Sequence, residues 1–320
     1  MNAREPRGWR AIALLAGLLS VAPLHAQQAP PESAPVISAE RLMATVRTLA
    51  SEPFQGRASG TEGNAKARAL IQARFDEMHL QPVGGSREQS FTFVPRGKGA
   101  PAAAAAPMAG INVVGRCPGT EPGLKAIVLS AHYDHVGIRD GKMYPGADDN
   151  ASGTAAILEL AAQCMARPFR HDVVVAAFDA EESGLNGARA FVASGVVAKD
   201  QIVVNVNLDM VARGDKGEIY VAGTHRSPAL RKLLEPVAGR APIGVRFGHD
   251  LPGSGEDDWT LQSDHGEFHK AGVPFVYFGV EDHPDYHQPT DTPDKINPDF
   301  FVKAVNVILD ALRALDEGLK

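Results

Sequence analysis

Short apolar runs alternate along the chain with longer segments in which apolar residues recur every three or four positions. The short runs predict strands at residues 90–94, 111–116, 126–131, 173–179, 202–209, 219–222 and 275–279. The longer segments predict helices at residues 151–166, 187–194 and 228–238. Alternating strands and helices predict an α/β fold: a single three-layer α/β/α domain around a mixed, mostly parallel sheet.

Capping signals place the remaining helices. Ser38 is expected to cap a first helix that contains Leu49, and a second helix is expected at residues 62–79. A last helix begins at Asn297 and runs to about residue 315. The turn-rich residues 54–61 are expected to be a connector.

The first residues have the pattern of a secretory signal peptide. Arg4, Arg7 and Arg10 precede an apolar run at residues 11–19, and Ala26 is the expected cleavage point. The run is well short of the roughly 20 residues that cross a bilayer, so a retained anchor is the less favoured alternative. We expect an exported protein, periplasmic or secreted, that is soluble after cleavage.

These patterns divide the chain into segments. Residues 1–26 are the predicted signal peptide, residues 27–37 a flexible leader, and residues 38–320 one folded domain. Residues 97–110 are biased to Ala and Pro and predict a mobile surface loop.

Composition narrows the class of partner. The chain is 44% hydrophobic and 22% charged, as soluble globular proteins are, and its formal charge of −6 excludes the basic surface of a nucleic-acid-binding protein. Peptides or small molecules are the expected partners. Export would permit a disulfide between Cys117 and Cys164, but the helical spacing of Cys164 among apolar residues favours a separate, buried side chain.

Polar residues follow three of the predicted central strands. His132 and Asp134 follow the strand at residues 126–131, the pair Glu181-Glu182 follows the strand at 173–179, and Asp209 ends the strand at 202–209. In open α/β sheets, ligands bind beyond the carboxyl ends of the strands, so these groups are expected to converge on one crevice.

A turn at residues 146–153 carries two further carboxylates, Asp148 and Asp149. Taken alone, Asp149 or Asn150 is more simply explained as the cap of the next helix. Together with the residues at the strand ends, however, the turn completes the His, Asp and Glu ligands that two zinc ions about 3.5–4 Å apart require.

Five motifs then resemble those of the co-catalytic two-zinc aminopeptidases of peptidase clan MH. They occur in the order of that family, over about residues 42–315. The motifs are Ser130-Ala131-His132-Tyr133-Asp134, Gly146-Ala147-Asp148-Asp149-Asn150-Ala151-Ser152-Gly153, Glu181-Glu182-Ser183-Gly184, Asn207-Leu208-Asp209-Met210 and Tyr286-His287-Gln288-Pro289-Thr290-Asp291.

The resemblance implies a zinc-exopeptidase fold and a role for each matching residue. The implied zinc ligands are His132 and Asp209 for one ion and Glu182 and His287 for the other, with Asp148 bridging both. Glu181 is the implied general base and acid, and Asp134 would orient His132 without binding metal. A cis peptide bond is implied between Asp148 and Asp149.

The chemistry that follows is hydrolysis of the first peptide bond of a peptide with a free amino terminus. Glu181 would take a proton from water held between the two zinc ions and pass it to the leaving amine. The five implied residues then supply all of the expected zinc ligands, so His135, His265, His269 and His283 are not expected to bind metal. Asp264, in a Ser-Asp-His stretch that is also typical of the family, is a weaker candidate for a supporting role.

Several alternatives stay open on the same fold. Glutaminyl cyclases resemble this family but usually hold one zinc and lack the intact Asp-Asp-Asn turn. The metal residues alone do not separate an aminopeptidase from a carboxypeptidase or dipeptidase, since specificity is expected to lie around residues 247–259. A non-catalytic zinc-binding protein is disfavoured because Glu181 is present. Relatives with an inserted protease-associated domain carry it ahead of the metal residues, where this chain has the short loop at 97–110.

Overall fold

The computed structural model describes residues 1–2, 36–95 and 106–320. The predicted cleavage point and most of the predicted leader and loop lie outside these ranges. The end of the predicted loop, residues 108–110, belongs instead to strand β3 (Met108–Cys117). No helix in the described ranges is long and apolar enough to cross a membrane.

The central sheet runs in the order β1-β3-β7-β4-β8-β11-β9-β10, with β2 also paired to β3. Besides β3, its strands are β1 (Gln81–Pro82), β2 (Glu88–Phe93), β4 (Ala126–His132), β7 (Val173–Phe178), β8 (Ile202–Leu208), β9 (Glu218–Ala222), β10 (Gly244–Phe247) and β11 (Phe275–Gly279). Strands β7, β4, β8 and β11 form a parallel centre, whereas β1, β2, β3 and β9 make antiparallel pairs. The sheet is therefore mixed, as predicted, with its parallel pairs concentrated where the strands are most buried. A separate hairpin joins β5 (Gly137–Arg139) and β6 (Lys142–Tyr144).

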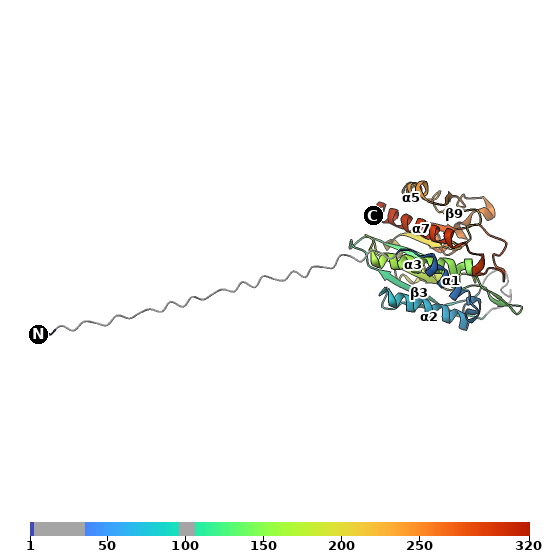
Figure 1. Cartoon of the computed structure of the whole chain (residues 1–320), viewed down its shortest axis with the longest axis horizontal. Coiled ribbons are helices and arrows are strands. Elements are labelled where there is room, and N and C mark those ends of the chain that lie inside the picture. Colours follow the sequence, from blue (N-terminus) through green and yellow to red (C-terminus); the bar gives the residue numbers. More distant parts are fainter. Residues whose placement is uncertain (3–35, 96–105) are drawn as a thin grey trace. The chain divides into compact units, whose positions relative to one another are not determined.

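Helices cover both faces of the sheet, giving the predicted three layers. They are α1 (Ala39–Leu49), α2 (Glu62–Glu77), α3 (Gly153–Ala166), α4 (Asn186–Ser194), α5 (Pro228–Arg240), α6 (His265–Lys270) and α7 (Pro298–Gly318). Figure 1 labels α1, α2, α3, α5 and α7, whose buried side chains belong to one part of the core. Short helical turns are η1 (Glu52–Arg57), η2 (Ala147–Ser152), η3 (Lys199–Gln201), η4 (Gly255–Asp257), η5 (Trp259–Leu261) and η6 (Pro293–Lys295). Ser38 accepts a hydrogen bond from the backbone of Arg41, as expected of the cap of α1.

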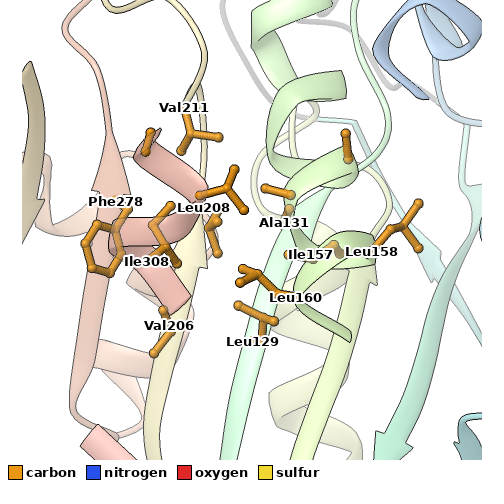
Figure 2. Close-up of a cluster of buried hydrophobic side chains, with 14 of the residues drawn as sticks. Leu129, Ala131, Ile157, Leu158, Leu160, Val206, Leu208, Val211, Phe278 and Ile308 are labelled. Carbon is orange, nitrogen blue, oxygen red and sulfur yellow. The ribbon is translucent and has the colours of Figure 1, made fainter. Parts of the chain in front are cut away.

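The core has two parts because successive residues of a strand face opposite sides of the sheet. Leu129 and Ala131 of β4 belong to the cluster that also includes buried side chains of α1, α2, α3, α5 and α7, and Figure 2 shows this side around Leu208 and Ile157. Val128 lies in the opposite cluster, where the rings of Phe178, Phe191 and Phe268 come together from β7, α4 and α6.

Cys117 and Cys164 form a disulfide that joins the end of β3 to α3, with their Cα atoms 6.3 Å apart. The expectation of two separate buried thiols was wrong. Both residues are buried, as the spacing of Cys164 indicated, but the fold brings them to bonding distance.

Candidate metal centre

Three neighbouring parallel strands bring their carboxyl ends to the same edge of the sheet. In the register of β4 with β7, His132 lies opposite Phe178, and in that of β4 with β8, Ser130 lies opposite Asn207. The polar residues that follow these strands therefore emerge side by side, which confirms the convergence expected from the sequence.

One group of potential ligands consists of His132, Glu181 and Asp209. The Nε2 atom of His132 lies 3.3 Å from Oδ1 of Asp209, and one ligand atom from each of the three residues lies within 4.8 Å of the others. His132 is buried and Asp209 is 8% exposed, so the group faces a protected space.

A second group consists of His135, Asp149, Glu182 and His287. The Nε2 atom of His287 lies 3.0 Å from Oδ2 of Asp149 and 3.1 Å from Oε2 of Glu182. Nδ1 of His135 lies 2.7 Å from Oε1 of Glu182. Each of these side chains presents a nitrogen or oxygen of the kind that zinc binds.

Asp149, not Asp148, stands between the two groups. Its Oδ1 lies 3.4 Å from Nε2 of His132, while its Oδ2 faces His287 on the other side. The expected bridging residue, Asp148, points elsewhere: its Oδ1 accepts a hydrogen bond from the backbone of Ala212, and its Oδ2 lies 3.3 Å from Nε2 of His283. The structure thus places the carboxylate of Asp149, rather than that of Asp148, between the two ligand groups.

Distant residues fix the conformation of the turn that presents Asp149. The carboxylate of Asp291 accepts hydrogen bonds of 3.1 Å from the backbone N–H groups of Asp148 and Asp149. Asn150 donates to the carbonyl of Leu208, at the end of β8. The cis peptide bond lies between Asp149 and Asn150, one residue later than expected.

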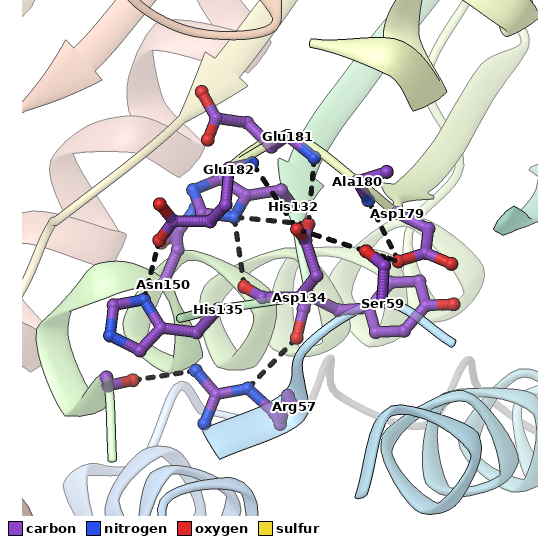
Figure 3. A network of polar contacts seen from close by, with 12 residues as sticks. Arg57, Ser59, His132, Asp134, His135, Asn150, Asp179, Ala180, Glu181 and Glu182 are labelled. Atoms are coloured by element: carbon purple, nitrogen blue, oxygen red, sulfur yellow. Dashed lines mark hydrogen bonds and ion pairs between the residues drawn. The ribbon is translucent and has the colours of Figure 1, made fainter. Parts of the chain in front are cut away.

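Asp134 supports both groups from behind. Its carboxylate accepts hydrogen bonds from the backbone N–H groups of Glu181 and Glu182, at 3.0 and 3.3 Å (Figure 3). The Nδ1 atom of His132 lies 3.2 Å from the backbone carbonyl of Asp134 and 3.7 Å from its carboxylate. Asp134 thus orients His132 mainly through its backbone and places the Glu181-Glu182 pair through its side chain.

The predicted connector at residues 54–61 also supports the site, which sequence reasoning missed. Arg57 is fully buried and reaches the carbonyl groups beside the expected ligands (Figure 3). Ser59 donates to Asp179, at the end of β7. A turn-rich composition gives no sign of such long-range contacts.

The buried carboxylates of the site favour positively charged groups beside them. Burial opposes protonation of His287, but Asp149 and Glu182 outweigh it and raise the pKa of His287 to about 11. Burial likewise opposes ionisation of Glu182, yet His135 and His287 hold its pKa at about 2. Oδ2 of Asp149 and Oε1 of Glu182 are buried, and each lies beside an imidazole nitrogen, of His287 and His135 respectively. Carboxylate oxygens and imidazole nitrogens gathered around a common point fit a bound metal ion.

The other histidines and Asp264 fall in different places. His265 donates a hydrogen bond from Nε2 to the carbonyl of Trp259, and His283 faces Asp148. Asp264 is buried, neither of its carboxylate oxygens has a hydrogen-bond partner, and burial raises its pKa well above the usual range. Of the four histidines that were not expected to bind metal, His135 is the one that the structure brings into a ligand group.

Both groups open into a cavity of about 640 Å³. Aromatic rings form part of its wall, including Trp259, which stacks on His249 with ring centroids 3.6 Å apart. The cavity also receives the acidic residues Glu256, Asp257, Glu281 and Asp282. Within the stretch predicted to govern specificity, Trp259 lines this cavity, whereas Phe247 packs against the core instead.

A model of peptidase family M28 matches residues 112–312. Among curated proteins, the chain is 29% identical to the aminopeptidase YwaD of Bacillus subtilis, over 58% of this chain and 40% of that protein. It is 31% identical to the probable lipoprotein aminopeptidase LpqL of Mycobacterium tuberculosis, over 53% of this chain and 39% of that protein. The matched part spans only about two fifths of these relatives' length.

Solved structures support the fold. BSAP, a zinc aminopeptidase from Bacillus subtilis, matches with a TM-score of 0.72 at 19% identity, over 90% of this chain and 97% of that one. A glutaminyl cyclase from Fimbriiglobus ruber matches with a TM-score of 0.70 at 23% identity, over 90% and 99%. These likenesses confirm the predicted α/β architecture, which both kinds of enzyme share.

Proposed function

Since this chain belongs to peptidase family M28, we propose that it is a zinc-dependent aminopeptidase, which hydrolyses the first peptide bond of peptides with a free amino terminus. The observation that carries the proposal is the position of Asp149, whose two oxygens face His132 on one side and His287 on the other at the base of a cavity. A carboxylate between two ligand groups is what a pair of metal ions requires.

In this proposal, two zinc ions bind per chain. His132 and Asp209 hold one, Glu182 and His287 hold the other, and Asp149 takes the bridging role first expected of Asp148. When bound, zinc supplies an acidified water and a Lewis acid for the peptide carbonyl. The chain's own residues then hold these groups in place and move the protons.

Glu181 is the proposed general base and acid. Burial raises the pKa of its carboxyl group well above the usual range, with His132 opposing the shift. A more basic carboxylate is better suited to take a proton from water and return it to the leaving amine. The hydrogen bond from the backbone of Glu181 to Asp134 fixes where this base stands.

The charge of the cavity favours the amino end of a substrate. A carboxypeptidase or dipeptidase needs a cation for the terminal carboxylate, but no Lys or Arg lines the cavity among the described residues. Its acidic lining is suited to a protonated α-amine instead.

Glutaminyl cyclase activity is the second candidate, since the fold is shared. The grouping of His132 and Asp209 with Asp149 as a further metal position favours hydrolysis by two ions.

Export to the periplasm or medium is part of the proposal. Its support is the basic and apolar pattern at residues 4–26 together with the disulfide between Cys117 and Cys164, because disulfides persist mainly in oxidising compartments.

The proposal is tested by zinc content and by cleavage of a free peptide and the same peptide with a blocked amino terminus. We expect two zinc ions per chain and cleavage of the free peptide alone. Glu181→Gln should retain both zinc ions and lose turnover, while Glu235→Gln, an exposed control on α5, should behave as the wild type. Pyroglutamate formation, or release of residues from the carboxyl end, would refute the aminopeptidase assignment.

A further inference from the structure

His135 is a buried imidazole that faces carboxylates. Its side chain is 0% exposed, Nε2 has no hydrogen-bond partner, and Nδ1 is paired with the carboxylate of Glu182. Polar groups in a protein interior normally have partners, and buried carboxylates normally pair with cations or bind metal ions. An imidazole nitrogen directed at buried carboxylates is therefore placed where it could share a metal ion with them.

The Nδ1 atom of His135 is directed at the second ligand group. It lies 2.7 Å from Oε1 of Glu182 and 3.6 Å from Oδ2 of Asp149, and Figure 3 shows the ring of His135 facing Glu182. Two atoms bound to one zinc at about 2.0–2.2 Å are at most about 4.4 Å apart, so both separations suit ligands of a single ion. The ring of His135 also lies close to that of His287, with centroids 5.7 Å apart.

We propose that His135 is a fourth protein ligand of the metal ion held by Asp149, Glu182 and His287. This inference rests on the proposed two-metal centre and adds an asymmetry to it. Four protein ligands close a zinc site, whereas three leave a position open for water or substrate. The ion at His132, Asp209 and Asp149 is then the open one, and it is the one beside Glu181.

The asymmetry predicts which ion leaves first. Under a chelator, the wild-type protein should lose one zinc ion readily and retain the ion bound by four residues. His135→Ala should release both ions at comparable chelator concentrations, as should His287→Ala, which removes another proposed ligand of the same ion. His225→Ala, an exposed histidine, should match the wild type.

Titration of the metal-free protein with Co²⁺ separates a ligand from a mere support. Changing a residue that only orients a ligand typically weakens metal binding by 10–100-fold. We expect His135→Ala to weaken the tighter Co²⁺ by more than about 100-fold and to change its visible absorption spectrum. A smaller loss with an unchanged spectrum would overturn the proposal.

If His135→Ala does not fold, the proposal can still be tested by X-ray absorption of the wild-type protein loaded with zinc, which counts the imidazole ligands of the metal ions. Three imidazoles should be found for each pair of zinc ions, from His132, His135 and His287. Two imidazoles for each pair would overturn the role of His135 while leaving the aminopeptidase proposal intact. If the wild-type protein bound no zinc at all, the proposed function itself would be refuted.

Discussion

Arg57 donates a hydrogen bond of 2.9 Å from Nε to the backbone carbonyl of Tyr133, the residue that separates His132 from Asp134. The same guanidinium donates to the carbonyls of Pro145 and Gly146, just before the turn that carries Asp149. Burial lowers the pKa of Arg57 to about 10, so it remains charged at neutral pH. One side chain thus ties the end of β4 to the turn between the two ligand groups.

The planar fork of Arg57 should not be replaceable by another cation. Arg57→Lys keeps the charge but cannot reach all of these carbonyls, which leaves buried acceptors unpaired at about 1–3 kcal/mol each. We expect the free energy of unfolding in urea to fall by about 3 kcal/mol and zinc affinity to fall by roughly 10–100-fold. Arg240→Lys, at the end of α5, is the matched control. Equal stability of both variants would contradict the role given to Arg57.

The two neighbouring aspartates of the turn should differ sharply. Asp149→Asn changes the carboxylate that faces His132 on one side and His287 on the other, so we expect loss of bound zinc and of peptide cleavage. Asp148→Asn retains an oxygen for the backbone of Ala212 and should keep both metal ions, with a loss of about 1 kcal/mol in unfolding free energy. Zinc content after dialysis decides the matter, since the opposite order would restore Asp148 as the bridge.

Folding should become less favourable in acid because of His265. Burial lowers the pKa of its imidazole to about 3, whereas in the unfolded chain the pKa is near 6.5. Below about pH 6.5 the unfolded state therefore binds a proton that the folded state does not, and stability falls by about 1.4 kcal/mol per pH unit until about pH 3.

The measurement is urea unfolding of the metal-free protein, which removes any contribution from zinc release. Between pH 7.5 and pH 5, His265 alone should account for a loss of about 2 kcal/mol. His265→Gln should lack this part of the pH dependence, although it is less stable at pH 7.5 if the hydrogen bond to Trp259 is lost. An unchanged slope in the variant would show that His265 is not the group responsible.

The disulfide should stabilise the domain through the length of chain that it closes. Cys117 and Cys164 are separated by 47 positions, for which a cross-link contributes about 2–4 kcal/mol. Reduction of the wild-type protein should lower its unfolding free energy by that amount. A variant with both cysteines changed to Ala should be insensitive to the reductant, and a wild type equally insensitive to it would argue against the bond.

Strand patterns predicted the fold and the crevice in which most of the candidate residues lie, because buried strands and their polar ends are local features of sequence. His132 and Asp209 were singled out because each comes at the end of a run of largely apolar residues, and Glu182 because it belongs to the polar segment that follows β7. Short or marginal elements were missed: β10 is four residues long and only partly buried, and α6 has six residues.

The errors have a different physical origin. Which of two consecutive aspartates lies between the ligand groups depends on backbone torsions that are held by hydrogen bonds from the turn to Asp291 and Leu208, and sequence spacing does not reveal those bonds. His135 stands three residues beyond His132, and this spacing was the available signal for it. The disulfide required knowing that the end of β3 lies against α3.

Asp134 couples the position of the proposed base, Glu181, to that of a proposed metal ligand, Glu182. Its two oxygens hold the backbone of Glu181 and of Glu182, so neither carboxylate is positioned independently of the other. The distance between the carboxylate of Glu181 and the proposed metal position is therefore set by the geometry of one buried side chain, that of Asp134. Substitutions in the surrounding cavity can then change which peptides bind without moving the residues that carry out the reaction.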